Sequence, residues 1–430
     1  MSPPERDRPE AGSAAFVAAP ERTSPFLRTF RAFTYRDYRL LWGGAFTSSV
    51  GTWMQEVAQN WLILTMTGST FFLGLDGFLG DAPFLLFSLF GGVLADRMDR
   101  RRILFGSQIV QLSSALLLAV LIWRHAIHVW IILACSFVVG LAQSFGGPAY
   151  QALVPTLVDK KDIGNAVTLN SIQFNLARVI GPVLGGIAFA GLGAAACFGL
   201  NSLSFLPVIA VILILKRGEF SHGEGPHERV LDSLKAGLRA VRDGGALRGL
   251  IGLAFVGSFC AFPLVLFLPV FALRVFHQDA KGYSHLLAAF GIGAVVGAVG
   301  IAGMVGQVRR QGTLAVTMQA IFGALMVGFA LSRQPFLSYV LLFCAGAALM
   351  VVFAMFMTLV QSHVEDRMRG RVVSVYSLAF RGAIPLGNLA AGSLASSWNA
   401  PGVLVINGLI LMGMGVWILA RRSPGGVTSL

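Results

Sequence analysis

The sequence predicts an all-α membrane protein with twelve transmembrane helices arranged in two six-helix halves. Apolar stretches of about 20 residues, the length that spans a hydrocarbon core of about 30 Å, alternate with short polar joints along the chain. Of the 430 residues, 55% are hydrophobic and 12% charged, and the mean hydropathy is +0.73. Lysine and arginine gather in every second joint. A soluble domain cannot bury this much apolar surface, whereas a bilayer accepts it.

Each apolar stretch is predicted to form one transmembrane helix. Internal prolines such as Pro83 and Pro182 are compatible with this prediction, because neighbouring helices can satisfy the backbone groups that proline leaves free. The expected helices are, in order, 40–66, 70–95, 103–123, 128–150, 166–190, 194–215, 247–273, 283–306, 313–332, 336–358, 372–396 and 402–420.

The positions of the basic residues predict the orientation in the membrane. Of the 33 Lys and Arg residues, 27 lie in the N-terminal tail, every second joint and the C-terminal end. Cytoplasmic loops carry such an excess, so both termini are expected in the cytoplasm, with the protein in the inner or plasma membrane. The net charge of +13 then reflects orientation and contact with anionic lipid, and no nucleic-acid partner is expected.

Composition divides the chain into five parts. The first is rich in Pro, Ala, Arg and Glu and is expected to be a disordered tail. The central loop contains an amphipathic pattern over 228–242, which predicts a helix against the membrane or the bundle floor. The parts are a cytoplasmic tail (1–35), a first six-helix half (36–215), a cytoplasmic central loop (216–246), a second six-helix half (247–422) and a C-terminal tail (423–430).

An internal repeat relates the two halves. Sliding the sequence by 206 positions places Gly140 on Gly346, Gly181 on Gly387 and Gly186 on Gly392 without a gap. Shared glycines at one fixed offset are harder to obtain by chance than shared apolar residues. The repeat predicts two parallel halves related by an axis along the membrane normal, with a substrate path between them.

The joint after the second helix combines glycine, a carboxylate and a cluster of cations. This pattern predicts a cytoplasmic gate in which the carboxylate meets basic side chains or a helix N-terminus. Alternatively, the joint only sets topology, but the arginines alone would suffice for that. The residues of this motif are Gly92, Asp96, Arg97, Arg100 and Arg101.

With these residues the joint resembles the signature loop of the major facilitator superfamily, except that Asp99 replaces a glycine. The segment from Gly51 to Leu62, taken with this loop, is similar to the branch that contains the enterobactin exporter and transmembrane secretion effector permeases. The resemblance covers about residues 36–422. It implies a monomeric secondary transporter of a small molecule, and a siderophore is the substrate that the branch implies.

A glycine–proline motif in the fifth helix resembles the end of the exporter signature of this superfamily. Gly181, Pro182, Gly185 and Gly186 permit close approach of a neighbouring helix and a bend. Ala177 and Gln173 stand where earlier glycines are expected, and the fourth helix has no arginine of the kind found in proton-coupled drug exporters.

Charged and polar residues inside the membrane are the remaining candidates for function. A charge at the bilayer centre costs about 2.5–3.5 kcal/mol on insertion scales, so each one needs a partner or a role. We expect the carboxylates to bind protons and the arginines to contact substrate or the coupling carboxylates. The alternatives are pairing as internal glue and, for Asp76, solvation near the outer surface. The candidates are Glu56, Asp76 and Asp81 for proton coupling, and Arg178, Arg381, Gln55, Gln59 and Asn60 for the substrate cavity.

Together these features predict a proton-coupled exporter of a small organic molecule (a siderophore, drug or metabolite) working by alternating access. No phosphate-binding loop and no catalytic or metal-binding constellation is recognisable, so neither an enzyme nor a cofactor is expected. Two alternatives remain open at this point. One is an importer of the same fold, and the other is a membrane accessory or receptor protein that transports nothing.

Overall fold

The computed structural model describes residues 30–215, 230–302 and 310–421, except for the side chains of 88–97, 230–234, 302 and 366–367. No strand occurs in these ranges. The long helices are α2 (Arg36–Thr67), α3 (Thr70–Arg97), α4 (Arg100–Trp123), α5 (Val129–Leu153), α6 (Ile163–Ile214), α7 (Val230–Asp243), α8 (Gly245–Ala261), α9 (Pro263–Val270), α10 (Ala280–Ala302), α11 (Gln311–Leu331), α12 (Pro335–Ser362), α13 (Asp366–Ser397) and α14 (Ala400–Arg421). Short elements are η1 (Arg31–Thr34), η2 (Val154–Leu157), η3 (Lys160–Asp162) and a π-helical turn, η4 (Phe271–Val275).

Within the described ranges, ten helical segments are long and apolar enough to cross a membrane. They correspond to the expected helices, with α8, α9 and η4 together forming one of them. The polar α2 is not among the ten, and α6 counts as one segment although two helices were expected there. The end of the expected helix 283–306 lies outside the described residues.

α6 consists of two arms that fold back on each other at Gly193. This residue has φ 81° and ψ 176°, a conformation that only glycine adopts readily. Cys197 Sγ lies 3.8 Å from the carbonyl oxygen of Gly185, whereas twelve residues of straight helix would separate the two positions by about 18 Å. The chain therefore reverses where the sequence placed a break between 190 and 194.

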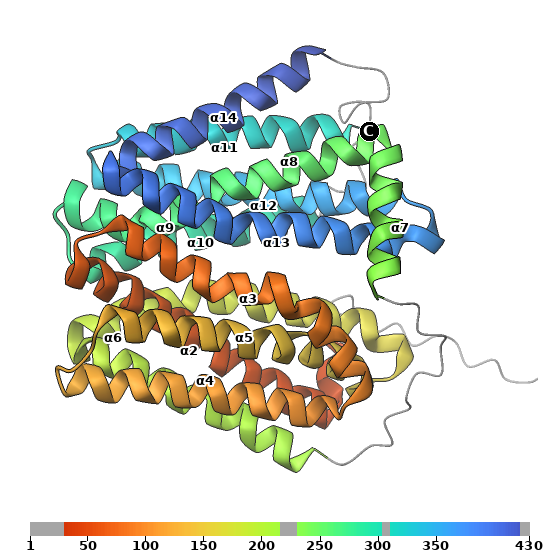
Figure 1. The fold of residues 1–430 in the computed structure, drawn as a ribbon, viewed down its shortest axis with the longest axis horizontal. Coiled ribbons are helices and arrows are strands. Elements are labelled where there is room, and N and C mark those ends of the chain that lie inside the picture. The colour runs from red at the N-terminus through yellow and green to blue at the C-terminus, as the bar shows by residue number, and fades with distance from the viewer. Residues whose placement is uncertain (1–29, 216–229, 303–309, 422–430) are drawn as a thin grey trace, which may run out of the picture.

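The long helices form two bundles (Figure 1). In the N bundle, α2 packs on α6, α3 on α5, and α4 on both α5 and α6. In the C bundle, α8 packs on α13, α10 on α12, and α11 on both α12 and α14. The bundles meet along two helix pairs, α3 with α13 and α6 with α10.

Glycines separated by 206 residues make equivalent contacts in the two bundles. A Cβ atom on Gly140 would meet the backbone of α3, and one on Gly346 would meet the backbone of α10. Likewise, a Cβ atom on Gly181 would meet α2, and one on Gly387 would meet α8. The sequence repeat thus coincides with a repeat of close helix approaches, in which small residues let backbones come together.

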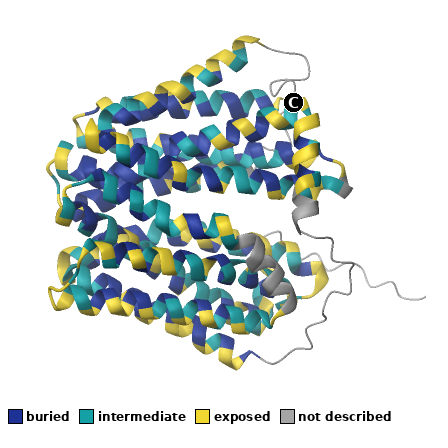
Figure 2. Cartoon of the chain, in the orientation of Figure 1, coloured by how far each residue is buried: buried dark blue, intermediate teal, exposed yellow. Residues whose placement is uncertain are grey.

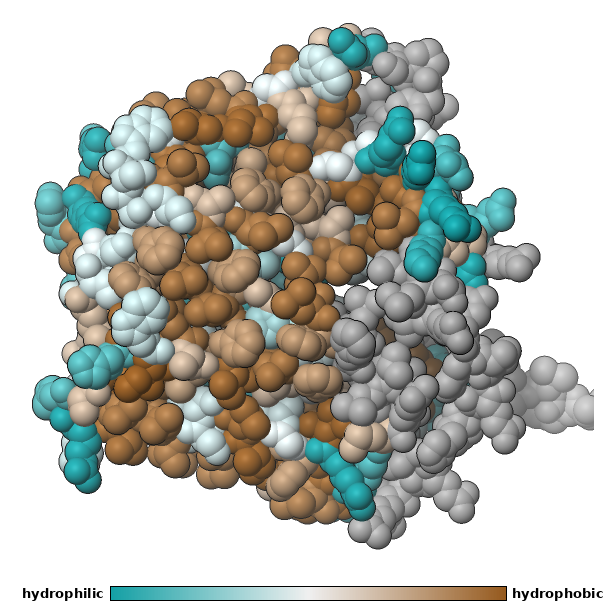
Figure 3. Space-filling model, viewed as in Figure 1, coloured by the Kyte–Doolittle hydropathy of each residue, from teal (hydrophilic) through white to brown (hydrophobic). Residues whose placement is uncertain are grey.

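The surface of the described part carries an apolar band. Exposed large side chains include Ile187, Leu203 and Val299, whose relative exposures are 60%, 59% and 70%. Apolar residues fill the middle of the face in view, and hydrophilic residues gather toward its two ends (Figure 3), while the buried residues run through both bundles (Figure 2). Exposed apolar surface of this extent is typical of lipid contact.

The two ends of the molecule differ in their loops. We call them the Gly68 end, which holds the turn between α2 and α3, and the Asp99 end, which holds the turn between α3 and α4. At the Asp99 end, α7 lies against the start of α13, where a Cβ atom on Gly237 would meet the carbonyl oxygen of Arg371. This placement agrees with a helix on the bundle floor.

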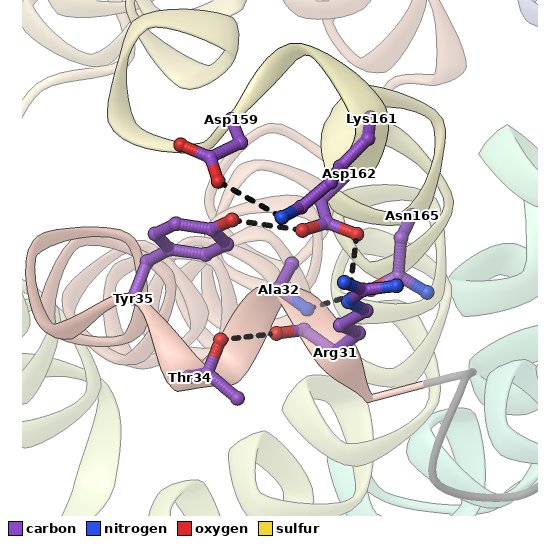
Figure 4. A network of polar contacts seen from close by, with 8 residues as sticks. All are labelled: Arg31, Ala32, Thr34, Tyr35, Asp159, Lys161, Asp162 and Asn165. Atoms are coloured by element: carbon purple, nitrogen blue, oxygen red, sulfur yellow. Dashed lines mark hydrogen bonds and ion pairs between the residues drawn. The ribbon is translucent and has the colours of Figure 1, made fainter. Parts of the chain in front are cut away.

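Residues 31–35 pack against the N bundle, whereas the sequence placed them in a tail that ends at residue 35. Residues 31–34 form η1, which docks on the joint between α5 and α6 (Figure 4). Arg31 Nε lies 3.2 Å from Asp162 Oδ1, and the Tyr35 hydroxyl donates to Asp162 Oδ2 at 2.8 Å. The Ala32 amide donates to Asn165 Oδ1 at 2.8 Å. These contacts are invisible to composition, because they join segments about 130 residues apart.

Ionisation at this docking site follows from the same contacts. Burial raises the pKa of Tyr35 to about 12, and the hydrogen bond to Asp162 adds to the effect. The nearby Tyr35 hydroxyl and Lys161 lower the pKa of Asp159. Lys161 Nζ lies 3.3 Å from Asp159 Oδ2. Tyr35 therefore stays a hydrogen-bond donor throughout the physiological pH range.

Candidate functional site

Four charged side chains of the bundles form two oppositely charged pairs. Glu56 on α2 interacts electrostatically with Arg178 on α6, and Asp81 on α3 interacts with Arg381 on α13. The second pair crosses between the bundles. The described ion pairs within 4.0 Å do not include them, so each pair attracts over a longer distance. Glu56 also interacts with Asp81, which links the two pairs.

Three of these four charges are exposed at the junction of the bundles. Glu56, Asp81 and Arg381 are exposed, and Arg178 is half-buried. Charged side chains on membrane helices almost always face protein or water rather than lipid tails. The arrangement therefore suits an aqueous path between the bundles better than contact with acyl chains.

Each arginine is seated on an aromatic ring of the N bundle. The guanidinium carbon of Arg178 lies 5.4 Å from the ring centroid of Trp53, and that of Arg381 lies 4.5 Å from the ring centroid of Phe84. Cations within about 6 Å of a ring face are attracted to its negative face. The rings thus orient the two cations.

Asp76 lies apart from these pairs, in a buried polar cluster on three helices. Its side chain is 7% exposed. Gln59 Nε2 on α2 donates to Asp76 Oδ2 at 2.8 Å, and Ser136 Oγ on α5 lies 2.6 Å from Asp76 Oδ1. The expected alternative of a carboxylate solvated near the outer surface is therefore wrong.

The other polar residues of α2 join different partners. Gln55 Nε2 reaches Gln59 Oε1 at 3.4 Å, and Gln55 Oε1 accepts from Asn201 Nδ2 at 2.7 Å. Asn60 Nδ2 instead reaches the Tyr283 hydroxyl in the C bundle at 3.4 Å. The polar α2 residues predicted for the substrate cavity are thus divided between a network inside the N bundle and a contact between bundles.

The glycine–proline motif of α6 packs against both bundles. Gly181, Pro182, Gly185 and Gly186 are all buried. A Cβ atom on Gly185 would lie 2.9 Å from the Met54 carbonyl oxygen of α2, whereas one on Gly186 would meet the Ser284 side chain of α10. The motif therefore sits where α6 contacts both its own bundle and the C bundle.

The predicted gate motif is described only in part. Gly92, Asp96 and Arg97 belong to α3, but their side chains lie outside the described residues. Arg100 Nη1 donates to the carbonyl oxygen of Ala152 at 3.1 Å, and Arg101 Nη2 donates to that of Ile212. These contacts place positive charge at the carbonyl ends of α5 and α6, where helix dipoles favour it.

Asp99, which departs from the superfamily loop, caps the N-terminus of α4. Its Oδ1 accepts from the Arg101 amide at 2.9 Å. Asp is among the best N-cap residues because its side chain satisfies an amide that the helix leaves free. The substitution for glycine thus has a local structural reason.

Contacts between the bundles extend from the Gly68 end to the middle of the molecule. Trp61 stacks on Tyr283 with 6.4 Å between ring centroids, Thr70 Oγ1 donates to the Gly392 carbonyl oxygen at 3.1 Å, and Arg274 Nη2 donates to that of Gly68. A cavity of about 430 Å³ opens at this end, lined by Arg274, Thr70 and residues of the α13–α14 turn.

Sequence reasoning missed several of these residues. Ser136 is an isolated serine in an apolar stretch. Tyr283 stands at the start of the expected helix 283–306, whose rotation about its axis the sequence does not fix. Arg274 is one of the basic residues outside the predicted cytoplasmic joints, and the sequence does not show its partner. A polar residue in an otherwise apolar helix, opposite a carboxylate on a neighbouring helix, is the signal that finds Ser136.

Comparison with known proteins gives a consistent family. The sequence matches the family described as transmembrane secretion effector over residues 27–426. It is 26% identical to the multidrug efflux pump Tap of Mycolicibacterium fortuitum over 86% of this chain and 92% of that protein. It is 25% identical to the staphyloferrin A transporter of Staphylococcus aureus over 82% and 87%, and 21% identical to macrolide efflux protein A of Streptococcus pyogenes over 88% and 95%.

Solved transporter structures share the fold. The nucleoside transporter NupG superposes with a TM-score of 0.70 at 12% identity, covering 90% of this chain and 100% of that one. A bacterial homolog of the human lysosomal transporter Spinster, in an inward-facing and unoccupied conformation, superposes with a TM-score of 0.66 at 15% identity, covering 93% and 96%. At such identities the likeness concerns the fold alone.

The family and these relatives are membrane transporters of small molecules rather than enzymes, which agrees with the many apolar helices of this chain. The resemblance noted in the sequence is therefore confirmed. By its sequence match, this multi-pass membrane protein belongs to the transmembrane secretion effector family of major facilitator transporters.

Proposed function

We propose that this protein exports a small organic molecule from the cytoplasm by proton-coupled alternating access. The observation that carries the proposal is the presence of two pairs of opposite charges at the bundle junction, Glu56 with Arg178 and Asp81 with Arg381. Two of the relatives are named efflux pump or efflux protein, and one is named staphyloferrin A transporter. A drug, siderophore or related metabolite is the substrate class that these names support.

The proposed architecture is twelve spans in two six-helix halves, 36–215 and 247–422. Counting α2 and both arms of α6 with the other segments supports twelve, and the equivalent glycine contacts of the two bundles support the duplication. Both termini are proposed to be cytoplasmic in the inner or plasma membrane, with the protein acting as a monomer. The Asp99 end would then face the cytoplasm, in keeping with the cations on its joints.

In this orientation the described contacts between bundles close the external side. Trp61, Tyr283 and Arg274 belong to that closure. Substrate would enter from the cytoplasm and reach the charges at the junction. Gln55, Gln59 and Asn60 are proposed to line or support this cavity, and the Gly181–Gly186 motif would provide the packing surface on which α6 moves.

The joint after α3 is proposed to be the cytoplasmic gate. Arg100 and Arg101 donate to carbonyl oxygens near the ends of α5 and α6. Gly92, Asp96 and Arg97 would complete the gate when the cytoplasmic side closes. A ligand shifts such an equilibrium only as far as it binds one facing more tightly than the other, so proton and substrate must each prefer one facing.

A substrate screen tests this function. A strain lacking the protein should become more sensitive to at least one siderophore, dye or antibiotic, and should accumulate more of that compound. The wild-type gene should restore export, and the Glu56→Gln and Arg178→Ala variants should not. Full activity after replacing Glu56, Asp81, Arg178 and Arg381 together would contradict the proposal.

A further inference from the structure

We propose that the cluster of Asp76, Ser136 and Gln59 is the proton-binding site of the transporter, separate from the charge pairs that meet the substrate. This inference rests on the proposed proton-coupled function and assigns that function to one carboxylate. It also gives a role to Ser136, which no motif in the sequence marks.

The first observation is that Asp76 has only neutral partners. Its two oxygens contact Gln59 and Ser136, and none of the described ion pairs within 4.0 Å includes it. Glu56 and Asp81 differ, because each already faces an arginine. A buried carboxylate without a cation beside it gains most from becoming neutral.

The charged groups around the cluster do not supply a missing partner. On α3 the neighbouring charge is Asp81, and on α2 it is Glu56, both negative. Arg381 on α13 and Arg178 on α6 act on those two carboxylates. The adjoining α5 and α9 contain no charged residue, and the titratable groups of α5 are Cys135 and Tyr150.

The second observation is that the cluster satisfies both protonation states without moving the backbone. Ser136 Oγ lies 2.6 Å from Asp76 Oδ1 and 3.1 Å from the carbonyl oxygen of Ile132. When Asp76 is ionised, the serine hydroxyl donates to Oδ1. When a proton from water binds Oδ1, the new O–H donates to Ser136 Oγ and the serine hydroxyl turns to Ile132.

Gln59 serves both states equally. Its Nε2 lies 2.8 Å from Asp76 Oδ2 and 3.0 Å from Ser136 Oγ, so its two hydrogens stay bonded before and after the proton arrives. An amide that directs its donors at the carboxylate also disfavours a metal cation there, since cations need oxygen ligands. The chemistry therefore favours a proton over sodium.

The third observation concerns the access of water to the cluster and the effect of protonation on the contact between the bundles. Glu56, less than one helical turn from Gln59 on α2, is exposed, so water comes close to the cluster. Gly74 and Gly77, on either side of Asp76, contact Asn388 of the C bundle. Neutralising Asp76 thus changes the charge of α3 directly beside the contact between bundles, where a change of facing must act.

Infrared spectroscopy of the purified full-length protein in lipid tests the assignment without a substrate. Lowering the pH should produce the C=O band of a protonated carboxylic acid, which Asp76→Asn removes. Ser136→Ala should keep the band at a shifted frequency, because one hydrogen-bond partner is lost, and Ser136→Thr should restore its position. Asp81→Asn is the matched control and should leave this band in place. A band unchanged in both Asp76→Asn and Ser136→Ala would overturn the inference.

A transport assay separates this inference from the proposed function. With ethidium as the probe in proteoliposomes, Asp76→Asn should lose accumulation driven by a pH gradient while keeping exchange without one. If the wild type and Asp76→Asn accumulate ethidium equally, the assignment of Asp76 is wrong and export stands. If the infrared band belongs to Asp76 but a pH gradient drives no screened compound, the proton site stands and the proposed function fails.

Discussion

At the scale of single residues, the packing of α6 on α2 depends on the absence of a side chain at Gly181. A Cβ atom there would lie 2.8 Å from the Val50 carbonyl oxygen and would also meet Cβ of Trp53. Backbone atoms cannot move aside as a flexible side chain can. The same contact recurs in the C bundle at Gly387, so both bundles share this requirement.

The Gly181→Ala variant should therefore be less stable than the wild type. Overpacking of this kind costs about 1–3 kcal/mol, which thermal unfolding of the purified protein in detergent would measure. Gly199→Ala is the matched control, because no heavy atom lies within 4 Å of its added Cβ. That control should be neutral or gain up to about 1 kcal/mol from helix propensity. Equal losses in both variants would refute the packing argument.

A second prediction concerns Tyr35 at the docked N-terminal segment. Its pKa is raised to about 12 from an ordinary 10, so the neutral phenol is favoured in the folded protein. The stabilisation is complete below pH about 10 and disappears as the pH rises through about 12. Difference absorbance titration of wild type against Tyr35→Phe should show one phenol ionising near 12. If the phenol that is lost in Tyr35→Phe ionises near pH 10 in the wild type, the docking described here is contradicted.

At the scale of elements, the helix made of α8, α9 and η4 is the most irregular in the C bundle. Pro263 starts α9, Pro269 lies within it, and η4 continues it as a π-helical turn. His277, just beyond, has φ 52°, which is uncommon outside glycine. π-Turns are frequent at functional sites, and this one carries Arg274 to the carbonyl oxygen of Gly68.

Removing that arginine should loosen the closure at the Gly68 end. In a cysteine-free background with Asn60→Cys, Arg274→Ala should speed labelling by a maleimide reagent that cannot cross membranes. Arg333→Ala, which removes an exposed arginine on another turn of the same end, is the control and should leave the labelling rate unchanged. The closure does not depend on Arg274 if both variants label alike.

The sequence pattern predicted most of the helices, because the length of an apolar stretch and the glycines between such stretches are local signals. The reversal of α6 at Gly193, the helix 230–243 and the ten apolar segments all fall near the expected positions. The order of residues 31–35 was not anticipated. It depends on Asp162 and Asn165, whose proximity only the folded chain creates.

The same limit applies to the candidate site. The sequence named Glu56, Asp81, Arg178 and Arg381, and the structure brings them together in pairs. The sequence alone could not show that Asp76 differs from these residues in having only neutral partners, because its partner Ser136 comes from another helix. In all-apolar helices the pattern leaves rotation about the helix axis undetermined, so which side chains meet is a property of packing.

At the scale of the whole molecule, the two bundles are joined along α3 with α13 and α6 with α10, and the proposed alternating access would be a rocking motion along these contacts. The charges at the junction lie where such a motion would expose them alternately to either side. The N bundle carries Asp76, Glu56 and Asp81, whereas the C bundle contributes Arg381, which faces Asp81 across the junction. Proton binding in the first bundle can therefore alter its attraction to the second.

The most direct test of proton-coupled export is the direction of transport in inside-out membrane vesicles. An acidic vesicle interior should drive uptake of a compound identified in the substrate screen, and collapse of the pH gradient should release it. Vesicles without the protein supply the baseline. Uptake that ignores the gradient, or that requires an acidic exterior, would contradict the account.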